Sequence, residues 1–302
     1  MQIRELASSI KRGNRASLAK GITLVENDPV LAPRLLRQMG TPGHSFVVGI
    51  TGPPGTGKSS LVDRLIEAYR KKGLRVGVIA VDPSSPLTGG ALLGDRIRMA
   101  GHTSDRGVFI RSMASRGWSG GLSRATSQVI RLMDAAGFDL ILLETVGIGQ
   151  SDIEVVGVSH AVIIVLMPGL GDDIQVSKAG LMEIGDIYVV NKSDLEGADI
   201  MVVNLLSLFR GSIRSPPVLK SSALSGEGID MLQDAIERIR SSFEAGDPEL
   251  KLKSIRGMIV ETARGSAMQR LAVVSESRAE GLARQVMGGK TTIEAAAARL
   301  AA

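Results

Sequence analysis

The sequence predicts an α/β protein built on a doubly wound, mostly parallel sheet, with N-terminal helices and a C-terminal helical arm. Short apolar runs, typical of strands buried on both faces, alternate along the chain with segments of helical periodicity. A glycine-rich motif follows the first of these runs and opens the first helical pattern behind it. Alternation of this kind favours right-handed crossovers, and therefore a largely parallel sheet.

The composition is that of an ordinary globular protein with a sizeable core. The chain has 302 residues, of which 44% are hydrophobic, and it contains no cysteine. The lack of cysteine and of a charged-then-apolar leader predicts a disulfide-free, cytoplasmic protein. The longest apolar runs, 140–143 and 161–167, are too short to span a bilayer. We therefore expect no membrane partner.

The charge balance could suggest nucleic acid as a partner. The net charge is +5, but lysine and arginine are scattered and aromatic residues make up only 3% of the chain. Few side chains are thus available for bases to stack on. We expect a solvated basic surface with affinity for anionic nucleotides, and no nucleic-acid partner.

The chain divides into three predicted parts. Residues 1–43 form a helical lead-in with two helical patterns, over 3–18 and 18–39, and Pro29 marks a start or break in the second. Residues 44–243 form the α/β domain. Residues 244–302 form a helical arm in which no strand is predicted.

Seven segments of the α/β domain are predicted strands. They are 46–50, 75–81, 108–111, 138–143, 161–167, 187–190 and 218–220. Helical patterns over 61–69, 129–133 and 229–239 follow three of them. Because the carboxyl ends of parallel strands share one edge of a sheet, the loops after these strands should converge there.

The segment 52–59 fits the pattern GxxxxGKS. In such a loop, glycines let backbone N–H groups point at an anion, the lysine reaches the β- and γ-phosphates, and the serine hydroxyl can bind Mg²⁺. A glycine-rich turn without a ligand is disfavoured, because the strand before it and the helix after it fit the functional interpretation. The residues expected to contact the nucleotide are Gly52, Pro53, Pro54, Gly55, Thr56, Gly57, Lys58, Ser59 and Ser60.

A second motif, NKxD, occupies 191–194 and follows the strand 187–190. The Asp194 carboxylate can accept hydrogen bonds from N1–H and the amine of guanine, and adenine offers neither donor. Asn191 is expected to brace the loops, and the stem of Lys192 to pack on the base. In the loop Ser222, Ala223 and Leu224, the Ala223 N–H can reach the guanine O6. The motifs together predict GTP and GDP over ATP.

Three carboxylates are expected on one side of the phosphates, where Mg²⁺ is held directly or through water. They are Asp82, Asp95 and Glu144, and with Ser59 they form the predicted metal ligands. A turn-capping role for Asp82 and a helix-capping role for Asp95 remain open, because aspartate is favoured at both positions. Glu144 and Gly147 stand where an Asp-x-x-Gly switch is common, and the Gly147 N–H could contact the γ-phosphate.

With these motifs, the sequence resembles the MeaB/ArgK family of methylmalonyl-CoA mutase-associated GTPases, which are P-loop GTPases of the SIMIBI class. The resemblance runs from about residue 19 to 241, and it rests on 52–59, 81–95, 144–150 and 191–194. It implies a homodimeric GTPase that acts as a chaperone for an adenosylcobalamin-dependent acyl-CoA mutase, gating cofactor loading and protecting or reactivating the mutase.

The resemblance also implies roles for individual residues. Lys58, Asp82, Asp95 and Glu144 would be the catalytic and switch residues around the phosphates and Mg²⁺. The loop 169–178 resembles an additional switch of the family, with Lys178 at its lysine position, although a lysine on a helix surface would look the same. No arginine finger is evident, since Arg98, Arg116 and Gln150 are only candidates for a catalytic assist, so we expect slow hydrolysis without a partner.

The helical pattern of the C-terminal arm indicates that the protein is a homodimer. After a linker at 244–248, helical patterns run over 250–300. Such an arm needs a partner surface to bury Met258, Ile259, Leu271 and Val274.

Three other GTPase or ATPase functions fit the sequence less well. A metal-insertion GTPase of the hydrogenase or urease type would use Cys or His ligands, but Cys is absent and His44, His102 and His160 lack ligand spacing. An ATPase linked to amino-acid transport would have to accept adenine, and Asp194 argues against that. A protein-targeting GTPase would carry a Met-rich domain, whereas the 12 methionines here are dispersed.

Overall fold

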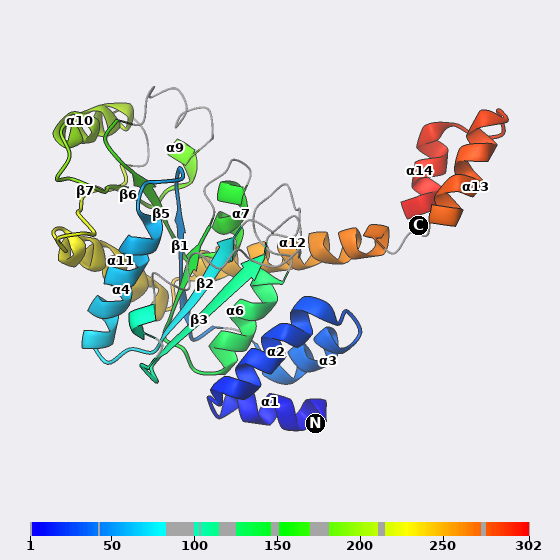
Figure 1. Cartoon of the computed structure of the whole chain (residues 1–302), viewed down its shortest axis with the longest axis horizontal. Helices are drawn as coiled ribbons and strands as arrows, with labels where there is room; N and C mark the ends of the chain where they lie inside the picture. Colours follow the sequence, from blue (N-terminus) through cyan, green and yellow to red (C-terminus); the bar gives the residue numbers. More distant parts are fainter. Residues whose placement is uncertain are drawn as a thin grey trace.

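The computed structural model describes residues 2–41, 43–82, 100–102, 104–114, 125–145, 151–169, 181–210, 215–272 and 276–301. At its centre lies a sheet of seven strands in the order β3-β2-β4-β1-β5-β6-β7. Every pairing between neighbouring strands of this sheet is parallel. Helices flank the sheet on both faces (Figure 1). The predicted doubly wound α/β fold is confirmed.

All seven predicted strands are present. They are β1 (Phe46–Thr51), β2 (Val76–Asp82), β3 (Val108–Ala114), β4 (Leu140–Glu144), β5 (Ala161–Leu166), β6 (Ile187–Val190) and β7 (Val218–Lys220). Every residue of β1, β4 and β5 is buried, as continuous apolar runs predict for central parallel strands. β3 continues beyond the predicted segment 108–111, because its later residues pair along the full length of β2.

Neighbouring residues of β1 contribute to two separate core layers. Val47 packs with residues of α6 (Thr126–Ala135) and α7 (Ser151–Val158), whereas Val48 packs with α4 (Lys58–Lys71) and α11 (Ile229–Glu244). The further described elements of this domain are the short η1 (Ala100–His102), α9 (Leu181–Ile184) and α10 (Ala198–Leu208). Because successive side chains of a strand point to opposite faces, the buried strands pack against one layer of helices on each face of the sheet.

The N-terminal segment forms three helices rather than the two predicted: α1 (Ile3–Lys11), α2 (Arg15–Asn27) and α3 (Leu31–Met39). The pattern over 3–18 is interrupted because the Asn14 side chain accepts a hydrogen bond from the Ser17 N–H and starts α2. The predicted break at Pro29 is present. Asp28 caps α3 there by accepting the N–H groups of Val30 and Leu31.

The C-terminal segment contains α12 (Pro248–Ala272), α13 (Glu276–Met287) and α14 (Ile293–Ala301). Figure 1 shows α12 leading away from the sheet, with α13 and α14 beyond its end. The first half of α12 crosses α7 closely, since a Cβ on Gly257 would lie 1.5 Å from the Gly157 carbonyl oxygen. Met258 packs on the protein's own core, whereas Ile259 is 63% exposed. Met258 therefore does not need the partner surface that was predicted for it, whereas Ile259 is left open to one. The side chain of Leu271 and the whole of Val274 lie outside the described part of the chain.

No helix in the described parts of the chain has both the length and the apolar character needed to cross a lipid bilayer.

One buried histidine ties the start of β1 to the connection between α7 and β5. The His160 side chain is 5% exposed, and its Nδ1 accepts a hydrogen bond from the Val47 N–H at 2.9 Å. Its ring lies 5.4 Å from that of Phe46 and 4.2 Å from that of Phe243, centroid to centroid. Burial lowers the pKa of His160 to about 4, so the ring is neutral at pH 7.

We predict that His160 makes the protein acid-sensitive. In the unfolded chain a histidine titrates near pH 6.5, so between about pH 6.5 and 4 the unfolded state binds more protons than the native state. The free energy of unfolding should therefore fall by up to about 3 kcal/mol between pH 7 and pH 4 through this group. Urea denaturation across this range should show that contribution in the wild type and not in His160→Gln.

The exposed His44 provides the matched control, because His44→Gln should keep the wild-type dependence on pH. Parallel pH profiles for wild type and His160→Gln would show that the buried ring is not the titrating group.

Candidate functional site

The segment between β1 and α4 forms a loop that requires glycine at defined positions. Gly52, Gly55 and Gly57 have positive φ angles of 140°, 81° and 87°, which side chains of L-residues rarely tolerate. A Cβ at Gly52 would lie 2.1 Å from the Val165 carbonyl oxygen, and one at Gly57 would lie 2.5 Å from Asn191 Nδ2. The loop is therefore shaped by backbone alone, as a cradle of N–H groups for an anion requires.

Lys58 begins α4 and reaches back over this loop. Its Nζ donates hydrogen bonds to the carbonyl oxygens of Gly52 at 2.8 Å and Pro53 at 3.0 Å. The side chain is buried. The Thr56 hydroxyl also donates to the Pro53 carbonyl, at 2.9 Å. The charge of Lys58 is thus held beside the N-terminus of α4. The lysine charge and the helix N-terminus each favour a bound phosphate.

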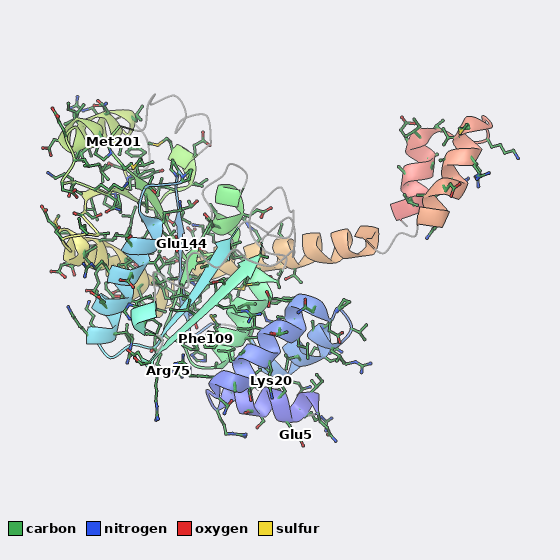
Figure 2. The ribbon with its side chains drawn as sticks, viewed as in Figure 1. Glu5, Lys20, Arg75, Phe109, Glu144 and Met201 are labelled. Atoms are coloured by element: carbon green, nitrogen blue, oxygen red, sulfur yellow. The ribbon has the colours of Figure 1, made fainter. Side chains whose placement is uncertain are left out.

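Ser59 meets the end of strand β4. Its Oγ donates a hydrogen bond to Glu144 Oε1 at 2.6 Å, and both side chains are buried. The contact follows from the sheet order, because β4 pairs with β1 so that Glu144 stands beside Ile50. Figure 2 shows Glu144 near the middle of the molecule, well away from Lys20 on α2. Hydroxyl and carboxylate oxygens are ligands that Mg²⁺ accepts, so this pair fits the predicted metal site.

Several predicted residues cannot be placed against this pair. Asp82 ends β2, but its side chain is not among those described. Asp95, Gly147 and Lys178 lie outside the described residues, as do Arg98, Arg116 and Gln150.

Asn191 connects the phosphate loop to the loop after β7. Its Nδ2 donates to the Thr56 carbonyl oxygen at 2.8 Å, and its Oδ1 accepts from Ser221 Oγ and the Ala223 N–H, each at 3.1 Å. The side chain is 1% exposed, and both of its polar atoms have partners within the protein. Asn191 thus holds the phosphate loop, the loop after β6 and the loop after β7 at fixed distances from one another.

The residues after Asn191 combine an unusual backbone conformation with an ionised carboxylate. Lys192 is, among the described residues, the one non-glycine residue with positive φ, at 57°. A lysine in this conformation is uncommon, and such strain often marks functional sites. The Ser222 hydroxyl donates to Asp194 Oδ1 at 2.7 Å and thereby lowers the pKa of Asp194 below its ordinary value. Asp194 is therefore an acceptor-only carboxylate at neutral pH.

The loop after β7 is held by hydrogen bonds from two sides. The Ala223 N–H, predicted to reach a guanine O6, donates to Asn191 Oδ1. The carbonyl oxygens of Ala223 and Leu224 accept hydrogen bonds from Arg64 on α4, at 2.8 and 2.9 Å. Arg64 was not predicted as a site residue. The sequence signal that could have found it is its position on α4, one turn after Ser60.

These elements enclose one pocket of about 370 Å³, a size typical of small-molecule sites. It joins the start of α4 to both loops that follow β6 and β7. Asp63 and Arg64 are the two lining residues that the sequence analysis did not predict. The full lining is Gly57, Ser59, Ser60, Asp63, Arg64, Asn191, Lys192, Asp194, Ser222, Ala223 and Leu224.

Comparison with known proteins agrees with this geometry. Residues 18–276 match the family model of the methylmalonyl Co-A mutase-associated GTPase MeaB. A putative GTPase of Pyrococcus abyssi is 51% identical over 250 residues, which cover 80% of this chain and 77% of the relative. The mitochondrial methylmalonic aciduria type A homolog of Mus musculus is 36% identical over 267 residues, covering 80% of this chain and 63% of the relative.

A solved structure supports the same assignment. The crystal structure of an LAO/AO transport system kinase matches with a TM-score of 0.72 and 26% identity, over 99% of this chain and 96% of that chain. The glycine cradle, the Ser59–Glu144 pair and the 191–194 loop all lie within the matched region. The chain belongs to the MeaB family of methylmalonyl-CoA mutase-associated GTPases.

Proposed function

We propose that this protein is a GTP-hydrolysing chaperone for an adenosylcobalamin-dependent acyl-CoA mutase of the methylmalonyl-CoA mutase type. It would gate cofactor loading and protect or reactivate the mutase. The observation that carries the nucleotide part is a single pocket that joins the phosphate loop to the carboxylate of Asp194. The mutase part is supported by the family, whose description names methylmalonyl Co-A mutase, and by the name of the mouse relative.

The pocket supports guanine over adenine. Asp194 lines it as an ionised acceptor, with one oxygen engaged by Ser222. Guanine offers two donors on the edge that would face this group, whereas adenine presents an acceptor at N1. A carboxylate facing an acceptor would be left without a partner and would disfavour ATP.

Ser59 and Glu144 would hold Mg²⁺, with Asp82 and Asp95 as the further predicted ligands. A bound Mg²⁺ would neutralise the charge that develops on the phosphates during hydrolysis. Lys58, poised over the loop, would contact the β- and γ-phosphates. The backbone of Gly52 to Ser60 would supply the remaining donors.

Hydrolysis by the isolated protein would be slow. The arginine in the pocket, Arg64, donates to two carbonyl oxygens and to Glu67 at 3.2 Å. Its guanidinium is therefore already used in holding the loop after β7, and it is not poised as an arginine finger. A mutase that placed Lys178 against the phosphates would accelerate the reaction.

The C-terminal arm supports a homodimer. Leu252, Ile255 and Ile259 repeat at helical spacing along α12 and are 66%, 45% and 63% exposed. An apolar stripe of this kind is stable in water when a second surface covers it. The second copy of this chain is the proposed cover.

We predict that Asp194→Asn exchanges guanine for xanthine. An amide donates to the C2 oxygen of xanthine, at the place where the carboxylate accepts from the guanine amine. GTP affinity should fall about 10- to 100-fold while XTP affinity rises. Competition between the two nucleotides for the Mg²⁺-loaded protein measures both changes.

Asp199→Asn is the matched control, because Asp199 pairs with Lys220 on the surface outside the pocket. An unchanged preference for GTP in Asp194→Asn would refute the assignment of the base-binding loop. The same assay tests the alternative of a transport-linked ATPase, for which ATP would compete as well as GTP does.

We predict that a methylmalonyl-CoA mutase-type enzyme changes the nucleotide chemistry of this protein. Suppose that a mutase binds the GTP-bound and GDP-bound forms of this protein with different affinities. Linkage then requires that the bound mutase changes the protein's relative affinity for the two nucleotides by the same factor. Titrating mutases against the protein should therefore shift GDP affinity or raise GTP hydrolysis well above the slow intrinsic rate. Lys58→Ala, which lacks the phosphate contact, should show neither intrinsic nor stimulated hydrolysis.

If no acyl-CoA mutase changed the GDP affinity or the rate of GTP hydrolysis, the proposed chaperone role would be wrong, whereas the assignment as a GTPase would be unaffected. Stimulation that survives intact in Lys178→Ala would remove the predicted role of that lysine alone.

A further inference from the structure

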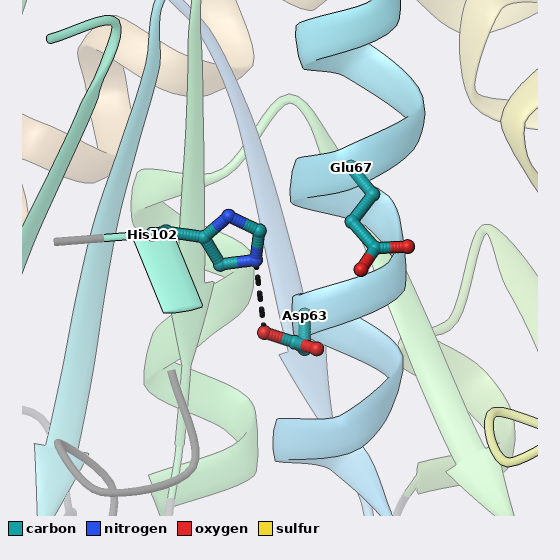
Figure 3. A group of neighbouring side chains, drawn as sticks. All are labelled: Asp63, Glu67 and His102. Carbon is teal, nitrogen blue, oxygen red and sulfur yellow. Dashed lines mark hydrogen bonds and ion pairs between the residues drawn. The ribbon is translucent and has the colours of Figure 1, made fainter. Parts of the chain in front are cut away.

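A second group of ionisable side chains lies on α4, next to the nucleotide pocket. Asp63 and Glu67 are one helical turn apart on α4, and His102 of η1 faces them (Figure 3). His102 Nε2 lies 2.9 Å from Asp63 Oδ1. One potential ligand atom from each of the three residues lies within 4.8 Å of the other two. Three ligand atoms therefore converge on one small volume.

We propose that Asp63, Glu67 and His102 bind a first-row transition-metal ion of the Zn²⁺ or Co²⁺ type. Imidazole nitrogen and carboxylate oxygen bind Zn²⁺ at about 2.0–2.2 Å, which places two ligands of one ion roughly 3 to 4 Å apart. The present separations come close to that arrangement, so small side-chain rotations suffice. The i, i+4 spacing of the two carboxylates directs both to one face of the helix.

The donor set selects the kind of ion. An imidazole favours Zn²⁺, Co²⁺ or Ni²⁺ over Mg²⁺ and Ca²⁺, which prefer oxygen alone. This site thus differs in chemistry from the Ser59 and Glu144 pair, whose ligands are all oxygen. The side chains of His102, Asp63 and Glu67 are 14%, 31% and 41% exposed, so water can reach an ion and complete its coordination.

The contacts already present do not prevent metal binding. The His102–Asp63 hydrogen bond would give way to two metal–ligand bonds from the same atoms, with His102 neutral. Glu67 pairs with Arg64 at 3.2 Å, but such exposed pairs contribute little to stability. Arg64 is independently held by the carbonyl oxygens of Ala223 and Leu224, so Glu67 can turn to an ion without releasing it.

The position of the site connects it to the nucleotide. Asp63 also lines the nucleotide pocket, and it follows Ser59 by one turn of α4. An ion at this site would join η1 to the helix that carries Lys58 and Ser59. The site rests on side chains of α4 and η1, so it stands or falls separately from the proposed mutase partner.

Cobalt titration tests the proposal directly. Full-length protein without an affinity tag is stripped with EDTA, dialysed, and titrated with Co²⁺ in excess Mg²⁺, which occupies oxygen-only sites. Visible absorption of bound Co²⁺ and calorimetry give the coordination and the stoichiometry. We expect one Co²⁺ per chain, displaced by Zn²⁺, with affinity at least about tenfold lower in His102→Gln and in Glu67→Gln.

His44→Gln is the matched control, since His44 is exposed and makes no side-chain contact with these carboxylates. Because Glu67 is exposed, Glu67→Gln should leave the fold unchanged, and urea unfolding with GDP binding checks that both variants are native. Equal Co²⁺ affinity in wild type and both site variants, or no saturable binding below about 0.1 mM, would overturn the proposal.

Discussion

The nucleotide site depends on the buried side-chain amide of Asn191. One amide makes three hydrogen bonds, to the phosphate loop at Thr56 and to the loop after β7 at Ser221 and Ala223. Its burial, at 1% exposed, makes these bonds costly to lose, because a freed partner would have no water to replace it. This one residue therefore fixes the separation between the phosphate loop and the loop after β7. The parallel sheet supplies the frame, since it brings the ends of β1, β4 and β6 to one edge.

Much of this architecture is predictable from the sequence because its signals are local. Buried parallel strands require continuous apolar runs, so all seven strands were identified, and the glycines of 52–57 are needed for positive φ angles that few residues adopt. The juxtaposition of Ser59 with Glu144 also followed from strand alternation. The number of N-terminal helices did not, because a side-chain cap such as Asn14 interrupts a helix without disturbing its apolar pattern.

The remaining features depend on contacts between distant residues, which periodicity does not encode. The pairing of Arg64 with the backbone at Ala223 and Leu224 spans about half the chain. His102 was set aside as lacking ligand spacing, yet the fold places it beside two carboxylates 35 and 39 residues earlier in the chain. Met258, expected to need a partner surface, instead packs on the core where Gly257 lets α12 approach α7. In each case the missing information is the packing of one element on another.

The most direct test of the account is the affinity of Asn191→Ala for GDP, measured by calorimetry beside Asn204→Ala, which changes an exposed asparagine on α10. If Asn191 sets the distance between the two loops, its loss should weaken GDP binding by about 10- to 100-fold, through the loss of several buried hydrogen bonds. Urea unfolding of both variants checks that each is native under the conditions of the calorimetry. Wild-type GDP affinity in folded Asn191→Ala would contradict the account, and a loss confined to that variant would support it.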